Sequence, residues 1–382
     1  MDDAHPIDDP LAAARARVAY PADGPYFQSH SIGLAPTDAR DALADLYLDP
    51  WAAARGDAWD AWLEGIARFR GNLAPLIGAA PDEICEQVNV SSALTKILFS
   101  LPERRGRRTI VLTEDDFPTI GNVLAQAARL GYRLAFLPGG PALADPGAWA
   151  RAFKDDVHLV HVTHVYSNSA LRPPVAEICR RAREAGAWSV VDVAQSAGAV
   201  PVDAHAWGAD FLTGTSVKYL CGGPGAAFLW ADPGRVDACK PIDVGWFSGT
   251  DPMAFDIRRF DYAPGAKRFA GGTPSVAPFV LAGASAARLG ALGVARIYDH
   301  NQALIDTLAS ALPAHAFLSH TERGARGSAV LVKPRDLGAA TGVLKDARVR
   351  HDVRAGGLRF SFHYYNTREE VQALAAILQD LV

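Results

Sequence analysis

The sequence predicts an α/β protein with a mainly parallel sheet, accompanied by a smaller α+β unit near the C-terminus. Between residues 109 and 230, short and continuously apolar runs alternate with amphipathic segments, as buried parallel strands alternate with covering helices. After residue 275 the pattern changes to two long helical segments, then strands and a last helix. A chain of 382 residues is also long for a single core, so two units are expected.

The expected elements follow in order along the chain. Helical patterns cover residues 37–54 and 60–76. The predicted strands of the large sheet are 109–113, 134–137, 157–164, 189–193, 211–213 and 226–230, with helices reaching 129 and covering 174–185. Ligand sites in such sheets lie at the carboxyl ends of the strands.

A stretch rich in Pro and Gly over residues 232–274 is predicted as a loop that contributes to an active site, because it is too long for a simple connection. Helices are predicted at 275–289 and 294–312, strands at 329–332 and 358–361, and a helix from 367. We expect three parts: an N-terminal arm (1–36) that joins the small domain, a large domain (37–260), and the end of the large domain with the small domain (261–382).

Composition and charge narrow the possible partners. The net charge is −4 and 21% of residues are charged, so neither nucleic acid nor an anionic membrane is expected as a partner. The four cysteines form no CxxC pair, and the N-terminus has no apolar signal segment. No apolar run has the length of a membrane span. These features predict reduced thiols in a cytoplasmic protein, and no metal site is expected.

Two charged residues follow neighbouring apolar runs. Asp192 ends the run VVD, and Lys218 follows the run that ends near Thr213, so both are expected at the same edge of the sheet. By itself Asp192 could cap a turn, and Lys218 could form a salt bridge or a Schiff base. The segment around Ser216 lacks the second Gly of G-x-S-x-G, and the Gly-rich turn 222–225 lacks the Lys-Ser/Thr of a Walker loop.

The block VDVAQSAGAVPVDAHAWGADFLTGTSVKYLCGGPGAAFLW resembles the class V aminotransferase family of fold-type I pyridoxal phosphate enzymes, and within it the kynureninases. Further similar segments are YFQSHSIGLAP, EDDFPTIGN, GWFSGTDPMAFD and RFAGGTPSVAP, so the resemblance covers most of the chain. It implies a seven-stranded sheet, pyridoxal 5′-phosphate as cofactor, an α-amino acid as substrate and a homodimer with a shared active site.

The resemblance also implies how the cofactor is held. Lys218 would carry it as a Schiff base and later move the α-proton, and Asp192 would keep its ring nitrogen protonated so that the ring acts as an electron sink. Gln195 would bind the phenolic oxygen, and Phe117 would stack on the ring. The residues matching Ser92 and Ala93 would bind the phosphate at the start of a helix.

Further residues are assigned to the substrate and to the second subunit. The element LRFSFHYYNT makes Arg359 the candidate for binding the substrate carboxylate. Thr273 would reach the phosphate from the other subunit. Trp246 would line the cofactor and substrate pocket, and His30 and His363 are candidate pocket-wall residues.

The sequence departs from the kynureninase pattern on the substrate side. Val217 replaces the tyrosine before the lysine, Ile120 replaces an aspartate, and Cys221 replaces an asparagine. The first hypothesis is a kynureninase-like hydrolase that cleaves the Cβ–Cγ bond of kynurenine or a related γ-keto amino acid. The alternatives are a class V lyase, desulfurase or aminotransferase acting on another amino acid, and a non-catalytic protein that binds the cofactor.

Overall fold

The computed structural model describes residues 10–53 and 57–382. The first residues of the predicted arm and the end of the helix predicted over 37–54 lie outside these ranges. The rest of that helix is divided into three consecutive pieces: α2 (Ala39–Leu43), a π-helical turn (Ala44–Leu48) and α3 (Asp49–Ala52). A short helix, α1 (Pro10–Arg15), precedes them.

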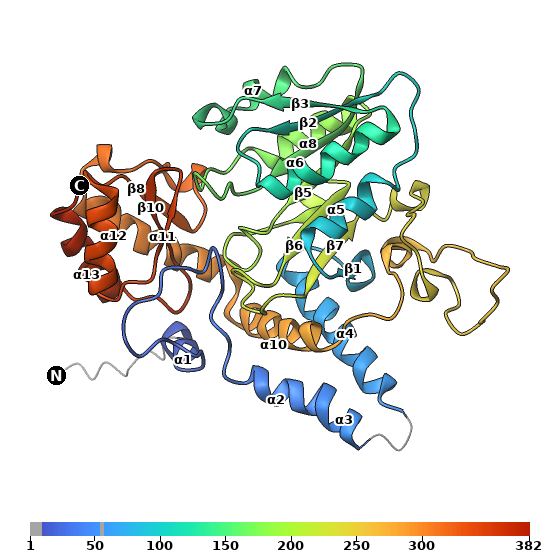
Figure 1. Ribbon diagram of the computed structural model, residues 1–382, viewed down its shortest axis with the longest axis horizontal. Coiled ribbons are helices and arrows are strands. Elements are labelled where there is room, and N and C mark those ends of the chain that lie inside the picture. Colours follow the sequence, from blue (N-terminus) through green and yellow to red (C-terminus); the bar gives the residue numbers. More distant parts are fainter. Residues whose placement is uncertain (1–9, 54–56) are drawn as a thin grey trace, which may run out of the picture.

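A seven-stranded sheet forms the centre of the molecule, in the order β1-β7-β6-β5-β4-β2-β3 (Figure 1). From β3 to β6 all neighbouring strands are parallel, whereas β7 is antiparallel to β6 and β1 is antiparallel to β7. The strands are β1 (Ile84–Gln87), β2 (Thr109–Thr113), β3 (Arg133–Leu137), β4 (Val157–Thr163), β5 (Trp188–Asp192), β6 (Phe211–Thr215) and β7 (Ala227–Ala231). The predicted mainly parallel α/β fold is therefore confirmed. β1 was not among the predicted strands, because two of its four residues are Glu86 and Gln87.

Helices cover both faces of this sheet, which explains why its central strands are continuously apolar. Successive residues of a strand point to opposite faces, so Val190 packs in one core cluster and Val191 in the other. The helices of the large unit are α4 (Trp59–Leu73), α5 (Val90–Leu98), α6 (Pro118–Leu124), α7 (Pro146–Ala150), α8 (Val175–Glu184), α9 (Ala204–Trp207) and α10 (Ala277–Leu292).

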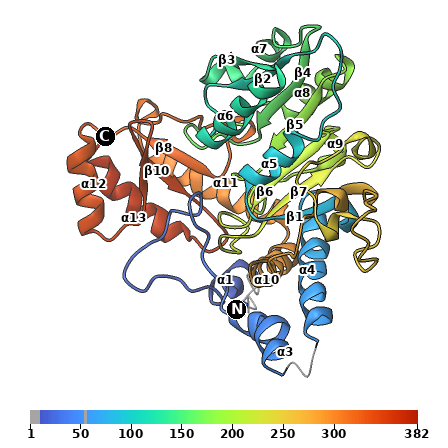
Figure 2. The same cartoon turned by 45° about the vertical axis from the view of Figure 1, so that its right-hand side comes forward.

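A smaller antiparallel sheet, in the order β8-β10-β9, lies to one side of the large sheet with its own helices (Figure 2). Its elements are α11 (Val294–Ala311), β8 (Ala329–Val332), α12 (Leu337–Asp346), β9 (Asp352–Arg354), β10 (Gly357–Ser361) and α13 (Arg368–Gln379). A third core cluster fills this unit and includes Phe27 of the N-terminal segment. Ser361 N donates a hydrogen bond to Phe27 O at 2.9 Å, so the arm packs directly on β10.

Among the described residues, no single helix has the length and apolar composition needed to cross a membrane. α10 and α11 reach that length and composition only as a pair, and they meet at a bend of 77°.

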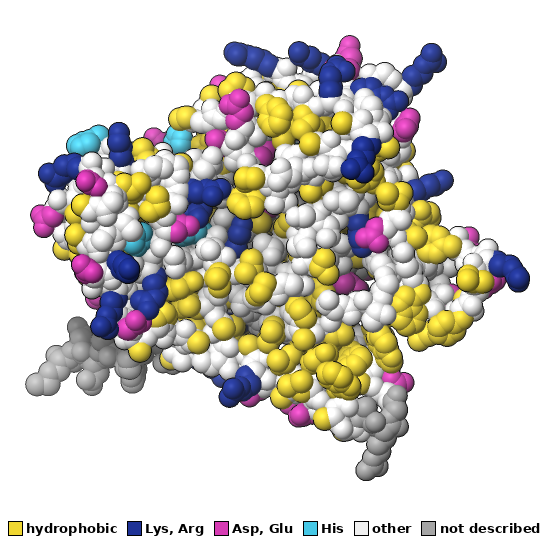
Figure 3. Space-filling view, in the orientation of Figure 1, with side chains coloured by type: hydrophobic (Ala, Val, Ile, Leu, Met, Phe, Trp, Pro, Cys, Tyr) yellow, Lys and Arg dark blue, Asp and Glu magenta, His cyan; other side chains and the backbone are white. Residues whose placement is uncertain are grey.

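The stretch over residues 232–274 contains only short 3-10 turns and extends away from the large sheet (Figure 1). Several of its apolar side chains are exposed, among them Phe255 at 79% and Ile257 at 99%. Figure 3 shows hydrophobic side chains gathered over the part of the molecule where Figure 1 draws this stretch. Exposure of this kind is typical of a surface that another molecule covers.

Candidate active site

A cavity of about 240 Å³ lies at the carboxyl ends of β4, β5 and β6. Parallel strands bring their last residues together at this edge, where α/β proteins bind ligands. Its lining consists of Asn89, Val90, Ser91, Phe117, Thr119, Ile120, Thr163, Val165, Ser167, Asp192, Ala194, Gln195, Thr215 and Lys218. Four predicted site residues, Phe117, Asp192, Gln195 and Lys218, therefore lie together in one cavity.

Asp192 is the last residue of β5 and is 5% exposed. Ala194 N donates to its Oδ1 at 2.7 Å, while its Oδ2 has no hydrogen-bond partner in the described part of the chain. Burial raises the pKa of this carboxyl group, and the charges of His161 and Lys218 oppose that rise. One carboxylate oxygen is thus available for a cationic hydrogen-bond donor in the cavity.

Lys218 lies three residues beyond β6, and its amine has no hydrogen bond or ion pair with any residue that the structure describes. Burial lowers the pKa of this amine, the charge of Asp192 opposes the shift, and the charges of Arg359 and Arg354 add to it. A lowered pKa increases the fraction of neutral amine, which is the form that attacks a carbonyl group.

The backbone of Lys218 is fixed by the N-terminal segment. Gly33 N donates to Val217 O at 2.8 Å, and a Cβ at Gly33 would lie 2.1 Å from Lys218 O. Position 33 therefore has to be glycine for the arm to approach this closely. The family resemblance did not explain why position 33 is glycine, since Gly33 and Lys218 are 185 positions apart in the sequence.

Phe117 presents its ring to the cavity from the N-terminus of α6 and is 43% exposed. Lys218 Nζ lies 5.7 Å from the centre of this ring. Gln195 is anchored by the N-terminal segment, because its Nε2 donates to His30 O at 3.1 Å. An aromatic face and an amide thus border the space between Lys218 and Asp192.

Arg359 and His30 do not line the cavity, but each is hydrogen-bonded to a residue that does, Arg359 to Ser167 and His30 to Gln195. Arg359 donates to both oxygens of Asp352 and, through Nη1, to Ser167 O at 2.6 Å. His30 Nε2 lies 3.0 Å from Asp352 Oδ1. Burial alone would raise the pKa of Asp352, but the contacts with Arg359 and His30 lower it strongly. Burial lowers the pKa of His30 to about 4.

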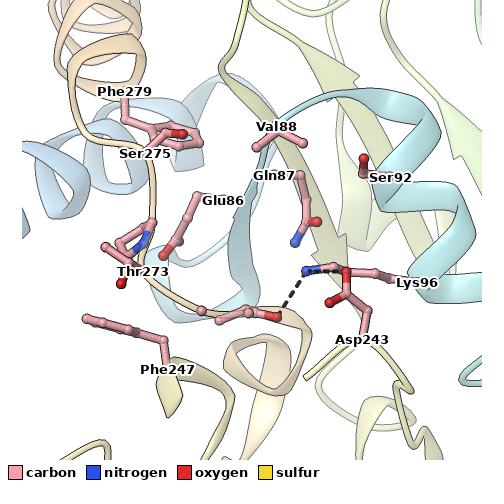
Figure 4. Close-up of a pocket in the computed structure, with 14 residues that line it drawn as sticks. Glu86, Gln87, Val88, Ser92, Lys96, Asp243, Phe247, Thr273, Ser275 and Phe279 are labelled. Carbon is pink, nitrogen blue, oxygen red and sulfur yellow. Dashed lines mark hydrogen bonds and ion pairs between the residues drawn. The ribbon is translucent and has the colours of Figure 1, made fainter. Parts of the chain in front are cut away.

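The structure places Ser92 and Thr273 in a second cavity of about 220 Å³, shown in Figure 4. Between them lies Lys96, which donates to Phe269 O at 2.9 Å and is 3.5 Å from Asp243. Ala93 is fully buried, and neither Ser92 nor Ala93 is among the lining residues of the Lys218 cavity.

At the start of α5, Val90 and Ser91 line the Lys218 cavity, and Asn89 Oδ1 caps the helix by accepting from Ser92 N at 2.8 Å. The amides of Val90 and Ser91 precede that capped amide and carry the positive partial charge of a helix N-terminus. The N-terminus of α5 thus lines the cavity with Val90 and Ser91, whereas the predicted phosphate-binding residues were Ser92 and Ala93.

Trp246 lies in neither cavity lining. Its ring packs edge-on against Trp59 at 6.0 Å and against Phe247 at 4.6 Å, and it stacks on Phe255 at 6.3 Å. His363 is also away from the cavity: its Nε2 contacts Tyr219 O at 2.7 Å, and its Nδ1 accepts from Tyr364 N. His363 therefore supports the segment that follows Lys218 rather than forming a pocket wall.

Sequence reasoning missed several polar residues of the cavity. Thr163 and Thr215 end β4 and β6, a position that the strand-end rule identifies. A buried pair lies behind Asp192: His161 Nδ1 is 3.3 Å from Asp116 Oδ1, which also accepts from Thr163 Oγ1 at 2.6 Å. No spacing in the sequence connects Asp116 with His161, because the pair forms only between β4 and the segment before α6.

These features fit pyridoxal 5′-phosphate. The unpartnered amine of Lys218 suits an aldehyde, the free oxygen of Asp192 suits a protonated ring nitrogen, and the exposed face of Phe117 suits a flat ring. The N-terminus of α5 suits a phosphate. No group of three or more His, Cys, Asp or Glu side chains suited to a metal ion occurs in residues 10–53 and 57–382.

Comparisons with known proteins show the family and the fold of the chain. The family model "Aminotransferase class-V" matches residues 36–374. Kynureninase from Deinococcus radiodurans is 30% identical, covering 99% of this chain and 96% of its own. The uncharacterized aminotransferase YcbU from Bacillus subtilis is 30% identical over 83% of this chain and 84% of its own. A cysteine desulfurase from Thermococcus onnurineus has the same fold, with a TM-score of 0.85, 22% identity and 97% of each chain covered.

Proposed function

The chain belongs to the class V aminotransferase family, and from this premise we propose that it is a kynureninase-like hydrolase cleaving the Cβ–Cγ bond of kynurenine or a related γ-keto amino acid. It is a kynureninase-like member of that family, and its cofactor is pyridoxal 5′-phosphate. The observation that carries the proposal is the presence of Lys218, Asp192 and the Phe117 ring in one cavity.

The cavity residues have separate tasks in this proposal. The bound cofactor supplies an electron sink for negative charge at Cα of the amino acid. Asp192 holds the proton on the ring nitrogen, and Phe117 and Gln195 orient the ring. Lys218, with its lowered pKa, moves the proton at Cα.

Arg359 is proposed to bind the α-carboxylate. Three of its N–H groups already donate to Asp352 and Ser167, which fixes the guanidinium beside the cavity and leaves two of its five donors. Hydrolysis then consumes one water, whose oxygen ends on Cγ as part of an acid, while Cβ gains a proton and alanine leaves.

We also propose a homodimer with a shared active site. Thr273 and Trp246, which the family resemblance assigns to the cofactor, lie outside the cavity of Lys218 in the same chain. The exposed apolar side chains Phe255 and Ile257 belong to the same stretch, 232–274. A second copy covering this stretch would bury them and bring its own Thr273 toward the phosphate position.

A second candidate is a class V lyase or aminotransferase acting on a different amino acid. Ile120 lines the cavity where kynureninases carry an aspartate, and Val217 cannot donate a proton as their tyrosine does. A desulfurase that forms a persulfide is disfavoured, since Cys221 and Cys239 are both buried and burial raises their thiol pKa values to about 12 and 11. Unpaired thiols also suit the reducing cytoplasm proposed for this protein.

Product analysis distinguishes these functions. The purified holoenzyme is incubated with L-kynurenine, 3-hydroxykynurenine and a panel of amino acids, and the products are identified by mass spectrometry. The hydrolase proposal requires equal amounts of alanine and an anthranilate-type acid. A keto acid or ammonia from another amino acid, without cleavage of either kynurenine, would instead establish the second candidate.

A further inference from the structure

A tight hairpin formed by β9 and β10 carries two arginines toward the cavity. Arg354 pairs with Gly357 and Asp352 pairs with Arg359, so only Ala355 and Gly356 form the turn. Both have positive φ, at 49° and 77°, as a two-residue hairpin turn of type I′ requires. Because Asp352 and Arg354 are two positions apart, their side chains lie on the same face of β9.

Arg354 reaches the same aromatic ring as Lys218. Its Cζ lies 5.7 Å from the centre of Phe117, and Lys218 Nζ lies 5.7 Å from that centre as well. Arg354 is partly buried, and its positive charge acts on Lys218. A second cation is therefore held at the edge of the proposed cofactor site.

The two arginines differ in their partners. Arg359 is 7% exposed and is bound to both oxygens of Asp352 and to Ser167 O. Arg354, in contrast, has no hydrogen bond or ion pair with any residue in 10–53 or 57–382. A guanidinium held in position without an acceptor is suited to an anion that arrives with the ligand.

We propose that Arg354 binds an acidic group at the end of the substrate side chain, so that the substrate is an amino acid with two acidic groups. The inference rests on the proposed function only in that an α-amino acid binds at Lys218. Of the two arginines, Arg359 is the more buried, and its charge lowers the pKa of Lys218 more than that of Arg354 does. Arg359 is therefore suited to the α-carboxylate, which lies next to the reacting carbon. Arg354 stands farther out, at the hairpin tip, where the end of a side chain would lie. L-Kynurenine has no second acidic group, so the inference favours a related acidic γ-keto amino acid.

The test compares matched amino acids that differ only in the charge of the side chain. L-Aspartate with L-asparagine and L-glutamate with L-glutamine are titrated into the holoenzyme, and binding is followed by the absorption spectrum of the cofactor. At least one acid is expected to bind about tenfold or more tightly than its amide, as one charge-assisted hydrogen-bond pair provides. In Arg354→Gln the acid and its amide should bind equally, and Arg354→Lys should restore part of the preference.

Arg348→Gln is the matched control, because Arg348 is exposed and lies six positions before Arg354, whereas the guanidinium over the Phe117 ring is that of Arg354. This variant should keep the preference of the wild type. Cofactor content and thermal unfolding verify that each variant is folded and loaded. Equal affinity for acids and amides in the wild type, or no binding of either acid, would overturn the proposal. If Arg354→Gln lowered the affinity for the acid and for its amide equally, the proposal would be overturned too, since Arg354 would then contact the α-carboxylate that both ligands share. Kynurenine cleavage is measured separately, so failure of the hydrolase function and failure of this inference are distinguishable.

Discussion

Lys218 and Asp192 line one cavity without forming an ion pair with each other. They follow neighbouring parallel strands, with Asp192 opposite Thr213 of β6 and Lys218 five positions beyond Thr213. Their charges still interact, since Asp192 opposes the fall in the pKa of Lys218 that burial causes. The separation leaves space between an amine and a carboxylate, which are the two groups that would hold opposite ends of the cofactor.

Replacing Lys218 is expected to abolish covalent attachment of the cofactor. Lys218→Ala removes the amine that bonds to the aldehyde, and the rate should fall by about 10²- to 10⁴-fold from the loss of acid–base catalysis alone. Borohydride reduction followed by peptide mass spectrometry should find the cofactor on the Lys218 peptide of the wild type and not in the variant. The exposed Lys345→Ala variant is the control, and a label on another lysine would contradict the assignment.

Gly33→Ala is expected to displace the backbone at Lys218. The added Cβ would lie 2.1 Å from Lys218 O and 2.7 Å from Cys221 Sγ, so the arm or the loop has to move. Overpacking of this kind costs about 1–3 kcal/mol in the free energy of unfolding. The urea concentration at the midpoint of unfolding should decrease, and so should the cofactor content of the purified protein. Gly71→Ala, on a helix position where a Cβ meets nothing within 4 Å, should instead stabilise the protein by about 0.4–1 kcal/mol.

Buried His363 predicts a loss of stability in acid. Burial lowers its pKa to about 4, although its contact with Tyr219 O opposes the shift. Since the ordinary histidine pKa is about 6.5, the folded state binds fewer protons than the unfolded state between these values. The stabilisation is therefore complete above about pH 6.5 and is lost as the pH falls toward about 4, by roughly 3 kcal/mol.

The measurement is urea unfolding at about pH 7.5 and about pH 5, where the wild type should lose roughly 2 kcal/mol through this residue. His363→Gln should show a correspondingly smaller difference between the two pH values. His315→Gln, at an exposed position, should keep the difference of the wild type. An unchanged pH dependence in His363→Gln would show that His363 is not the titrating group.

The exposed apolar stretch predicts which substitutions dissociate the proposed homodimer. A Phe255→Asp, Ile257→Asp double variant places two charges among side chains that a second copy would bury. Light scattering should report a monomer, and cofactor affinity should fall because Thr273 of the second subunit is lost from the site. Val343→Asp, at a 44% exposed position on α12, should leave the mass unchanged. A wild type that is monomeric at micromolar concentration and retains its cofactor would refute the shared site.

Much of the fold was predictable because its determinants are local. The predicted strand 189–193 is short and rich in valine, and it coincides closely with the buried parallel strand β5 (Trp188–Asp192). β9 was not predictable, because its three residues are polar or exposed and it exists only through pairing with β10. α12 was also missed, since Gly338 and Gly342 interrupt its helical pattern.

By itself the sequence indicated the family and the cofactor, through its resemblance to class V aminotransferases. It also indicated that Asp192 and Lys218 lie close together, because residues at the ends of neighbouring parallel strands meet at one edge of the sheet. Only the tertiary structure decided which other groups surround them. Asp116 with His161, Asp352 with Arg359, and Gly33 with Lys218 are contacts between segments far apart in the chain. The separation of Thr273 and Trp246 from the cavity was likewise set by the path of the backbone. The physical reason is that electrostatic and packing interactions depend on distance in space, which spacing along the chain does not specify.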